Sequence, residues 1–396
     1  MMKNSLSRPK RWLRGILPLL CVLTLAIVVG LGTLGPAESQ ASRQEIRGVW
    51  FTMNDFDTLR DRTKLQQALN ELRQLNFNTI YPVVWNAGYV LHPSPTAQQL
   101  GIQPFVYQGT EGQDILAELA AEAHRQGLTV IPWFEFGFMT PPTSELAIAR
   151  PQWLTTKADG TTTSVNDAGE VAWLNPFRPE VQKFITDLVL EVVTQYDVDG
   201  IQFDDHMALP NEFGYDPYTI ALHRREMGRS PDPNPQATAW IKWRADKITA
   251  FMTQLHKAVK AQKPNAIFAL SPNYYNFAYK LHLQDWLTWV RKGLIDELVM
   301  QVYRTDLASF LEQINRPEVK ETQQKIPTGI GILTGLRSKP MPIAQVQAQS
   351  QAAQEQNLGV AYFYYETLWQ STAEPAAVRQ AAFQSLFPYP ALRSPS

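Results

Sequence analysis

The sequence is poor in the residues that several common chemistries need. Its single cysteine, Cys21, lies among the first 41 of 396 residues, which excludes a disulfide framework and, beyond residue 41, a catalytic thiol. There is no glycine-rich phosphate loop and no Gly-x-Ser-x-Gly turn of a serine hydrolase. The six histidines do not follow metal-ligand spacing, so the sequence predicts neither a bound metal nor a cofactor.

An excess of basic charge is also lacking. Residues 1–41 carry five of the 36 basic and one of the 37 acidic residues, which leaves 31 basic and 36 acidic residues and a formal charge of −5. No basic patch suited to nucleic acid is present. No apolar run after residue 41 is long enough to span a membrane. We therefore expect no nucleic-acid partner, and membrane contact only through the N-terminal segment.

The N-terminal segment has the order of a secretory signal. Basic residues precede an apolar run, Ile16–Leu34, and small residues follow it as far as Ala41. Ser39 and Ala41 fit a cleavage site, yet the long apolar run also permits a retained anchor. Residues 1–41 are thus predicted to be a cleaved signal or an N-terminal anchor. The folded part would be exported to the periplasm or cell envelope, and a retained anchor would tether it to the inner membrane.

From Arg47 onward, short apolar runs rich in β-branched and aromatic residues alternate with segments of helical period. Buried strands joined by amphipathic helices indicate a parallel sheet covered by helices, and eight such units favour closure into a (β/α)8 TIM barrel. We expect one α/β domain over residues 43–388 and a loose tail over 389–396. The predicted strands are Arg47–Thr52, Asn78–Trp85, Leu128–Glu135, Gly200–Asp205, Ala266–Ser271, Glu297–Tyr303, Ile326–Ile332 and Gly359–Tyr365.

Two features qualify this pattern. Pro82, Pro132 and Pro327 lie in or beside predicted strands, although a closed barrel has no free edge; they would mark strand starts or bulges. The loops after the second, third and fourth strands are long, at about Asn86–Gln113 and two later segments, 137–176 and 207–235. Loops that follow the strands build the active-site face of such a barrel, so a substrate site is expected there.

The fourth predicted strand ends in Asp204, Asp205 and His206. Side chains alternate along a strand, so Gln202, Asp204 and His206 should share the inner face, while Asp205 points away or joins the loop. A residue at this end of a barrel strand is typically catalytic. Aspartates also cap turns, which is the structural alternative. The three polar groups could instead hold a divalent cation.

Two glutamates follow other predicted strands. Glu135 ends the apolar run Ile131–Phe134, and burial among aromatic residues would raise its pKa, as a general acid requires; a structural ion pair is the alternative. Glu366 follows the eighth strand, where it could instead be the N-terminal acid of a helix. Glycoside hydrolysis needs two carboxyl groups beside the scissile bond, and Asp204 with Glu135 would supply them.

Aromatic and polar residues accompany these acids at the predicted rim. Flat apolar faces and edge hydrogen bonds suit sugar rings, although core packing is the alternative for each residue taken singly. The candidate substrate-binding residues are Trp85, Asn86, Trp133, Asn175, His206, Asn273, Tyr274, Tyr303 and Trp369.

With these residues in view, the chain resembles the glycosyl hydrolase-like 10 family of bacterial envelope proteins. The matching segments are Glu45–Trp50, Phe77–Tyr81, Trp173–Val181 and Asp197–Asp205, of which the last two are the more specific. The resemblance extends over about residues 43–388 and implies a TIM barrel that acts on glycan. Some members are similar to enzymes that cut peptidoglycan strands lacking stem peptides. The chain departs from many relatives at Glu135–Phe138 and at His206.

We therefore predict an envelope glycoside hydrolase with peptidoglycan as its substrate, and an exported polysaccharide as the second choice. Asp204 would be the nucleophile or base and Glu135 the general acid, with Asp205 orienting Asp204 and Glu366 as a further candidate. One alternative is a non-catalytic glycan-binding protein on the same barrel. Another is a metal-dependent deacetylase-like hydrolase.

Overall fold

The computed structural model describes residues 44–100, 112–166 and 169–393. The predicted signal or anchor, part of the first long loop and the last three residues of the predicted tail lie outside these ranges. Among the described residues, no helix has the length and apolar character needed to cross a membrane.

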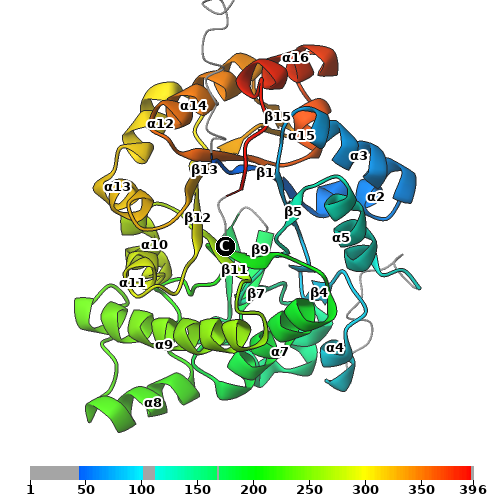
Figure 1. Cartoon of the computed structure of the whole chain (residues 1–396). Helices are drawn as coiled ribbons and strands as arrows, with labels where there is room; N and C mark the ends of the chain where they lie inside the picture. The colour runs from blue at the N-terminus through cyan, green and yellow to red at the C-terminus, as the bar shows by residue number, and fades with distance from the viewer. Residues whose placement is uncertain (1–43, 101–111, 167–168, 394–396) are drawn as a thin grey trace, which may run out of the picture. The chain divides into compact units, whose positions relative to one another are not determined.

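Nine strands form one parallel sheet at the centre of the domain, inside a ring of helices (Figure 1). Their apolar runs are almost entirely buried, as expected for a parallel sheet with a filled interior and a helical outer layer. In spatial order the strands are β5 (Thr129–Val130), β2 (Thr79–Pro82), β1 (Arg47–Phe51), β16 (Gly359–Phe363), β13 (Thr328–Leu333), β12 (Glu297–Gln301), β11 (Ile267–Ser271), β10 (Gly200–Asp204) and β6 (Trp133–Phe134).

The sheet closes at the third predicted strand, which Ile131 and Pro132 divide into β5 and β6. The backbone N–H of Ile131 donates to Ile80 of β2, and that of Gln202 in β10 donates to Pro132. This strand is therefore bonded on both sides, and the predicted (β/α)8 barrel is confirmed. Pro132 has no N–H to donate, which accounts for the interruption of the strand at this point.

Amphipathic helices cover the outside of the barrel because their apolar stripes pack on the strands. The stripe of the helix before β10, which includes Val181, Phe184 and Leu188, is buried as predicted. The longer helices are α3 (Arg62–Gln74), α5 (Ile115–Arg125), α7 (Pro179–Gln195), α8 (Pro217–Met227), α9 (Thr238–Gln262), α12 (Leu307–Ile314), α14 (Ile343–Glu355) and α16 (Ala376–Leu386).

Shorter elements occupy the connections between the strands and the longer helices. The helical ones are η1 (Met53–Asp55), α2 (Phe56–Leu59), α4 (Pro95–Gln99), α6 (Glu145–Ala149), η2 (Pro151–Trp153), α10 (Tyr275–His282), α11 (Trp286–Arg291), α13 (Pro317–Gln323) and α15 (Glu366–Trp369). Small antiparallel sheets are formed by β3 (Trp85–Asn86) with β4 (Tyr89–Val90), by β7 (Met139–Thr140) and β8 (Thr163–Asn166) with β9 (Gly169–Trp173), and by β14 (Gly335–Leu336) with β15 (Lys339–Pro340).

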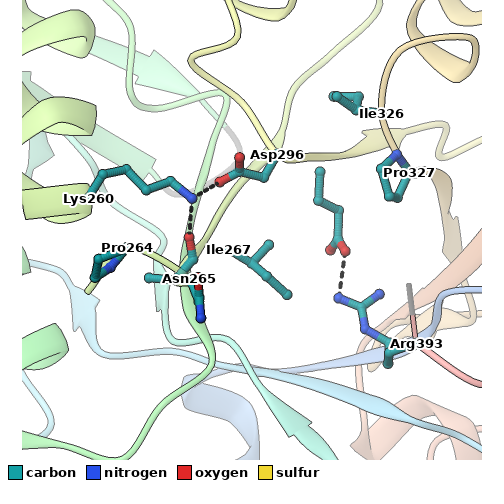
Figure 2. Close-up of a pocket in the computed structure, with 10 residues that line it drawn as sticks. Lys260, Pro264, Asn265, Ile267, Asp296, Ile326, Pro327 and Arg393 are labelled. Atoms are coloured by element: carbon teal, nitrogen blue, oxygen red, sulfur yellow. Dashed lines mark hydrogen bonds and ion pairs between the residues drawn. The ribbon is translucent and has the colours of Figure 1, made fainter. Parts of the chain in front are cut away.

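The end of the barrel at which the strands begin is closed by paired charges. Glu297, the first residue of β12, accepts a hydrogen bond from the Tyr81 hydroxyl at 2.8 Å and pairs with Arg393 at 2.5 Å. A cavity of about 230 Å³ lies beside this pair, where Lys260 contacts Asp296 at 2.8 Å (Figure 2). Each carboxylate here has a cationic partner, which is the arrangement of a stabilising layer.

The same contacts correct one expectation about the C-terminus. Residues from Tyr389 to Arg393 are not a loose tail, because Leu392 pairs with Gln44 and Arg393 enters the ion pair with Glu297. The proline-rich composition of this segment does not reveal these contacts, since its partners lie more than 90 residues away along the chain. Residues 394–396 are outside the described residues.

Candidate active site

Three acidic residues gather at the end of the barrel where the strands finish. Asp204 is the last residue of β10, Asp205 begins the turn that follows, and Glu135 comes directly after β6. β10 and β6 are paired neighbours, so their ends lie side by side. A tight contact holds the two turns together: Phe138 N–H donates to the His206 carbonyl, and a Cβ on Gly137 would lie 2.4 Å from that oxygen. Glycine is therefore required at position 137.

Asp204 is enclosed and its carboxylate oxygens are both engaged. Its side chain is only 2% exposed. One oxygen accepts hydrogen bonds from the backbone N–H and the Nδ1 of His206, at 2.8 and 3.1 Å, and the other accepts from Trp133 Nε1 at 3.1 Å. Burial raises the pKa of Asp204 to about 6, although the charge of His206 and these hydrogen bonds oppose the shift.

Asp205 is more accessible and is held differently. Its side chain is 20% exposed. Two neutral amides orient its carboxylate: Asn273 Nδ2 donates to one oxygen at 2.7 Å, and Gln301 Nε2 donates to the other at 3.1 Å. Gln301 is fixed in turn, because its amide also donates to the Ser271 carbonyl at 2.9 Å. The Asp205 carboxylate is thus positioned from β11 and β12 without a direct hydrogen bond from a cation among the described residues.

Glu135 has the environment that a proton donor needs. Burial and the nearby charge of Asp204 raise the pKa of Glu135 to about 7. Its hydrogen bond from Asn86 Nδ2, at 2.5 Å, opposes this shift only in part. The residue keeps part of its surface accessible. At neutral pH a substantial fraction of the Glu135 carboxyl groups is therefore protonated.

His206 supplies the positive charge of this group. Its ring lies between Phe136 and Trp173, with centroids 6.2 and 6.3 Å away. Burial disfavours the charged imidazole, but the carboxylates of Asp204 and Asp205 outweigh burial and raise the pKa of His206 to about 10. His206 is therefore a cation at neutral pH.

The group of Asp204, Asp205 and His206 also has the composition of a small cation site, with one ligand atom from each within 4.8 Å of the others. However, His206 Nδ1 lies 2.9 Å from the carbonyl oxygen of Glu135, which can only accept a hydrogen bond. This nitrogen must carry a proton in the observed arrangement, so only Nε2 could bind a metal. Because the pKa of His206 is raised to about 10, a metal would have to displace the proton from Nε2 at neutral pH.

Several of the predicted rim residues meet at this group. Asn86, Trp133, His206 and Asn273 bond directly to the acids, as described above. The Tyr303 ring stacks on Phe363 with centroids 5.2 Å apart. Burial and the charges of the nearby Asp205 and Asp204 carboxylates raise the pKa of the Tyr303 hydroxyl far above its usual range. This phenol therefore stays protonated and is available as a hydrogen-bond donor.

Other predicted residues lie elsewhere. Trp85 donates to the Gly137 carbonyl at 3.1 Å, and its ring packs on Phe184 of α7. Trp369 packs on Phe383 of α16, with centroids 5.7 Å apart. Both tryptophans face the helical layer, so their apolar area contributes to the core.

Asn175 and Tyr274 have local structural contacts. The Asn175 amide donates to Asp216 and Thr219 at 2.9 Å each and so fixes the start of α8. The Tyr274 ring, next to Asn273, lies under the guanidinium of Arg316 at 4.7 Å.

Glu366 is the first residue of α15 and is separate from the three acids. Both its oxygens accept from Arg337 Nε at 2.9 Å, and its backbone N–H donates to Asp55 at 2.8 Å. Asp55 also accepts from the backbone N–H of Thr52. Burial raises the pKa of Asp55 to about 7, although these hydrogen bonds oppose the shift. These contacts fit the helix-terminal alternative for Glu366 rather than a place beside Asp204 or Glu135.

Two residues of the group were not expected from the sequence. Gln301, which orients Asp205, is the last residue of β12 and could have been found as the polar end of the run Glu297–Gln301. Gln284 donates to the Asp204 carbonyl at 2.8 Å. Its position after a short loop helix gives no recognisable signal in the sequence.

Comparison with known proteins places this geometry in context. The family model described as glycosyl hydrolase-like 10 matches residues 45–353. The glycosyl hydrolase DigH of Escherichia coli (strain K12) is 27% identical over 310 residues, which cover 69% of this chain and 68% of DigH. The glycosyl hydrolase YngK of Bacillus subtilis (strain 168) is 22% identical over 300 residues, or 67% of this chain and 55% of YngK.

Solved structures give the same fold at low sequence identity. The glycoside hydrolase domain of PgaB (BpsB) from Bordetella bronchiseptica has a TM-score of 0.63 at 14% identity, with 89% of this chain and 99% of that domain covered. Alpha-L-fucosidase isoenzyme 2 from Paenibacillus thiaminolyticus has a TM-score of 0.61 at 15% identity, with 87% and 49% covered. At these identities the likeness concerns the barrel alone.

Proposed function

Because this chain belongs to the glycosyl hydrolase-like 10 family, we propose that it hydrolyses glycosidic bonds in a cell-envelope glycan. The family match confirms the resemblance indicated by the sequence motifs. The names of the relatives and the barrel fold support a glycan hydrolase in general terms. Peptidoglycan strands are the proposed substrate, with an exported polysaccharide as the second choice. This choice rests on the family resemblance and on the secretory character of residues 1–41.

One observation carries the proposal: a carboxyl group of raised pKa stands beside an accessible carboxylate at the active-site end of a barrel. Glycoside hydrolysis needs such an unequal pair, one member to protonate the leaving oxygen and one to attack or to activate water. Glu135, with its pKa near 7, is the proposed acid. Asp205, oriented by two amides and 20% exposed, is the proposed nucleophile or base.

This proposal exchanges the roles that the sequence suggested for the two aspartates. Asp204 is 2% exposed and both its oxygens already accept hydrogen bonds, so it has little capacity left for a substrate atom. We assign it a positioning role. It keeps His206 cationic, and the imidazolium in turn limits the repulsion among the three acids.

The test is release of soluble sugar fragments from purified peptidoglycan glycan strands that lack stem peptides. We expect the parent protein to release fragments. Glu135→Gln and Asp205→Asn should each lose at least about a thousandfold in kcat/KM, the order expected when an essential acid or nucleophile is removed. Asp204→Asn should lose less, because it acts through His206.

Glu366→Gln is the matched control, since it removes a rim carboxylate that is bonded to Arg337 and not to this group. Its activity should equal that of the parent. If Glu135→Gln were as active as the parent, the assignment would be wrong. If no variant and no parent released fragments, yet the parent retained the glycan, a non-catalytic glycan-binding protein would replace the enzyme.

A further inference from the structure

The C-terminal end of α10 is tied to the acidic group. Its last residue, His282, accepts a hydrogen bond on its carbonyl from the backbone N–H of Leu209 at 3.0 Å. Two residues further on, the Gln284 amide donates to the Asp204 carbonyl at 2.8 Å and to the Met207 carbonyl at 3.3 Å. The segment that follows the catalytic turn and the end of α10 therefore form one connected unit.

The imidazole of His282 lies within electrostatic reach of the acidic group. It interacts with the charges of both Asp205 and His206 and packs against Phe277, with ring centroids 5.0 Å apart. Burial lowers the pKa of His282, and the imidazolium of His206 acts in the same direction against the attraction of Asp205. His282 is therefore a neutral imidazole at neutral pH, with one nitrogen that donates and one that accepts.

One nitrogen of this ring, Nδ1, has no hydrogen-bond partner among the described residues. His282 Nδ1 is buried, while the residue as a whole stays partly exposed. In contrast, Nδ1 of His206 lies within hydrogen-bond distance of two oxygens. A buried polar group without a partner is unfavourable, so the partly exposed ring gains by turning toward a hydroxyl group that enters the site.

We infer that His282 is a substrate-binding residue that hydrogen-bonds a sugar hydroxyl on the Asp205 side of the site. The inference rests on the proposed function, because Asp205 marks the place of the reacting sugar. A neutral imidazole suits this role, since a hydroxyl group needs one donor and one acceptor and adds no charge to a site that already holds three acids. His282 would orient the sugar, and it takes no part in proton transfer.

The experiment compares His282→Phe, which keeps a ring but removes both nitrogens, with His282→Gln, which keeps a donor and an acceptor. With peptide-free glycan strands as the probe, we expect His282→Phe to raise KM about tenfold, the loss of one hydrogen bond, and to leave kcat within about twofold. His282→Gln should recover part of this loss. The melting temperature of His282→Phe should not fall, because an unpartnered nitrogen is removed.

His256→Phe is the matched control. His256 packs edge-on against Phe268 with centroids 5.6 Å apart, on helix α9 outside the barrel, and burial lowers its pKa as well. This variant should bind and hydrolyse like the parent. An unchanged KM for His282→Phe would overturn the inference, and so would a fall in kcat accompanied by a lower melting temperature, which would indicate a structural role.

Binding to the Glu135→Gln variant separates this inference from the proposed function. If the parent hydrolyses nothing, the proposed function fails, yet the dissociation constant for the glycan strands can still be measured. A His282→Phe, Glu135→Gln double variant that binds about tenfold more weakly than Glu135→Gln alone supports the sugar contact. Equal binding by the two overturns it.

Discussion

Buried carboxylates have different kinds of partner at the two ends of the barrel. Where the strands begin, Glu297 has Arg393 and a tyrosine hydroxyl as partners, and Asp296 has Lys260. Where the strands finish, three acids share a single imidazolium and several neutral donors. The first arrangement satisfies each charge, whereas the second leaves charges competing and raises the pKa values of Asp204 and Glu135. The first is the arrangement of a stabilising layer, and the second is that of a site suited to chemistry.

The largest effect on stability is expected at the paired end. Glu297→Gln leaves Arg393 without its anion in a nearly enclosed site, so the free energy of unfolding should fall by about 3–5 kcal/mol. Urea unfolding followed by circular dichroism measures this change. Because the acidic rim is untouched, kcat/KM of the folded variant should match that of the parent. An unchanged free energy of unfolding would contradict the stabilising role assigned to the charges at this end.

A glutamate-to-glutamine substitution at the rim, Glu135→Gln, should raise the free energy of unfolding instead of lowering it. Burial and the charge of Asp204 raise the pKa of Glu135 to about 7 from its ordinary 4.5, so between these values the folded protein holds a proton that the unfolded chain has lost. Stability therefore falls as pH rises through this window. Glu135→Gln should be more stable than the parent by up to about 3 kcal/mol at pH 8. Near pH 4.5 the difference should vanish, which repeated urea titrations can check.

The pH dependence of hydrolysis tests the protonation states assigned to the acids of the rim. Activity requires protonated Glu135, whose pKa is about 7, and is favoured by ionised Asp204, whose pKa is raised to about 6 and which holds His206 in place. We expect kcat/KM to fall about tenfold per pH unit above the pKa of Glu135, and to fall less steeply below the pKa of Asp204. A plateau that extends to pH 9 would contradict Glu135 as the acid.

The smallest effect is expected from metal removal. Nδ1 of His206 is bonded to the Glu135 carbonyl and the ring is a cation at neutral pH, so a metal at the rim would have to displace the proton from Nε2. Dialysis against a chelator should leave the rate of fragment release unchanged. Loss of activity that is restored by a divalent ion would favour the metal-dependent alternative instead.

The barrel could be predicted from the sequence because its strands are set by local patterns. Each of the eight apolar runs contributes to the barrel. The run that contains Pro132 was divided because this residue has no N–H to donate, and Trp85 at the end of the second run belongs to the separate strand β3. The C-terminal tail could not be predicted in this way. Its order depends on long-range contacts, such as the ion pair between Arg393 and Glu297 and the pairing of Leu392 with Gln44.

The site was predictable at the level of its acids and less so at the level of their roles. Alternation places Asp204 inside the barrel, but β10 ends there, so the direction of Asp205 is decided by the turn and by the amides of Asn273 and Gln301. The rim aromatics show the same limit. Composition cannot tell a tryptophan that faces the acids, such as Trp133, from one that faces a helix, such as Trp85.

The pairing of Gln44 with Leu392 holds the two ends of the described barrel close together. Both ends of the described barrel leave from the side of Glu297 and Arg393, opposite the acids. A support or fusion partner joined at either end would therefore sit behind the barrel and leave the acidic rim unobstructed. Immobilised through either end, the protein would meet a glycan strand with the same face, and both attachments should give the same rate of cleavage.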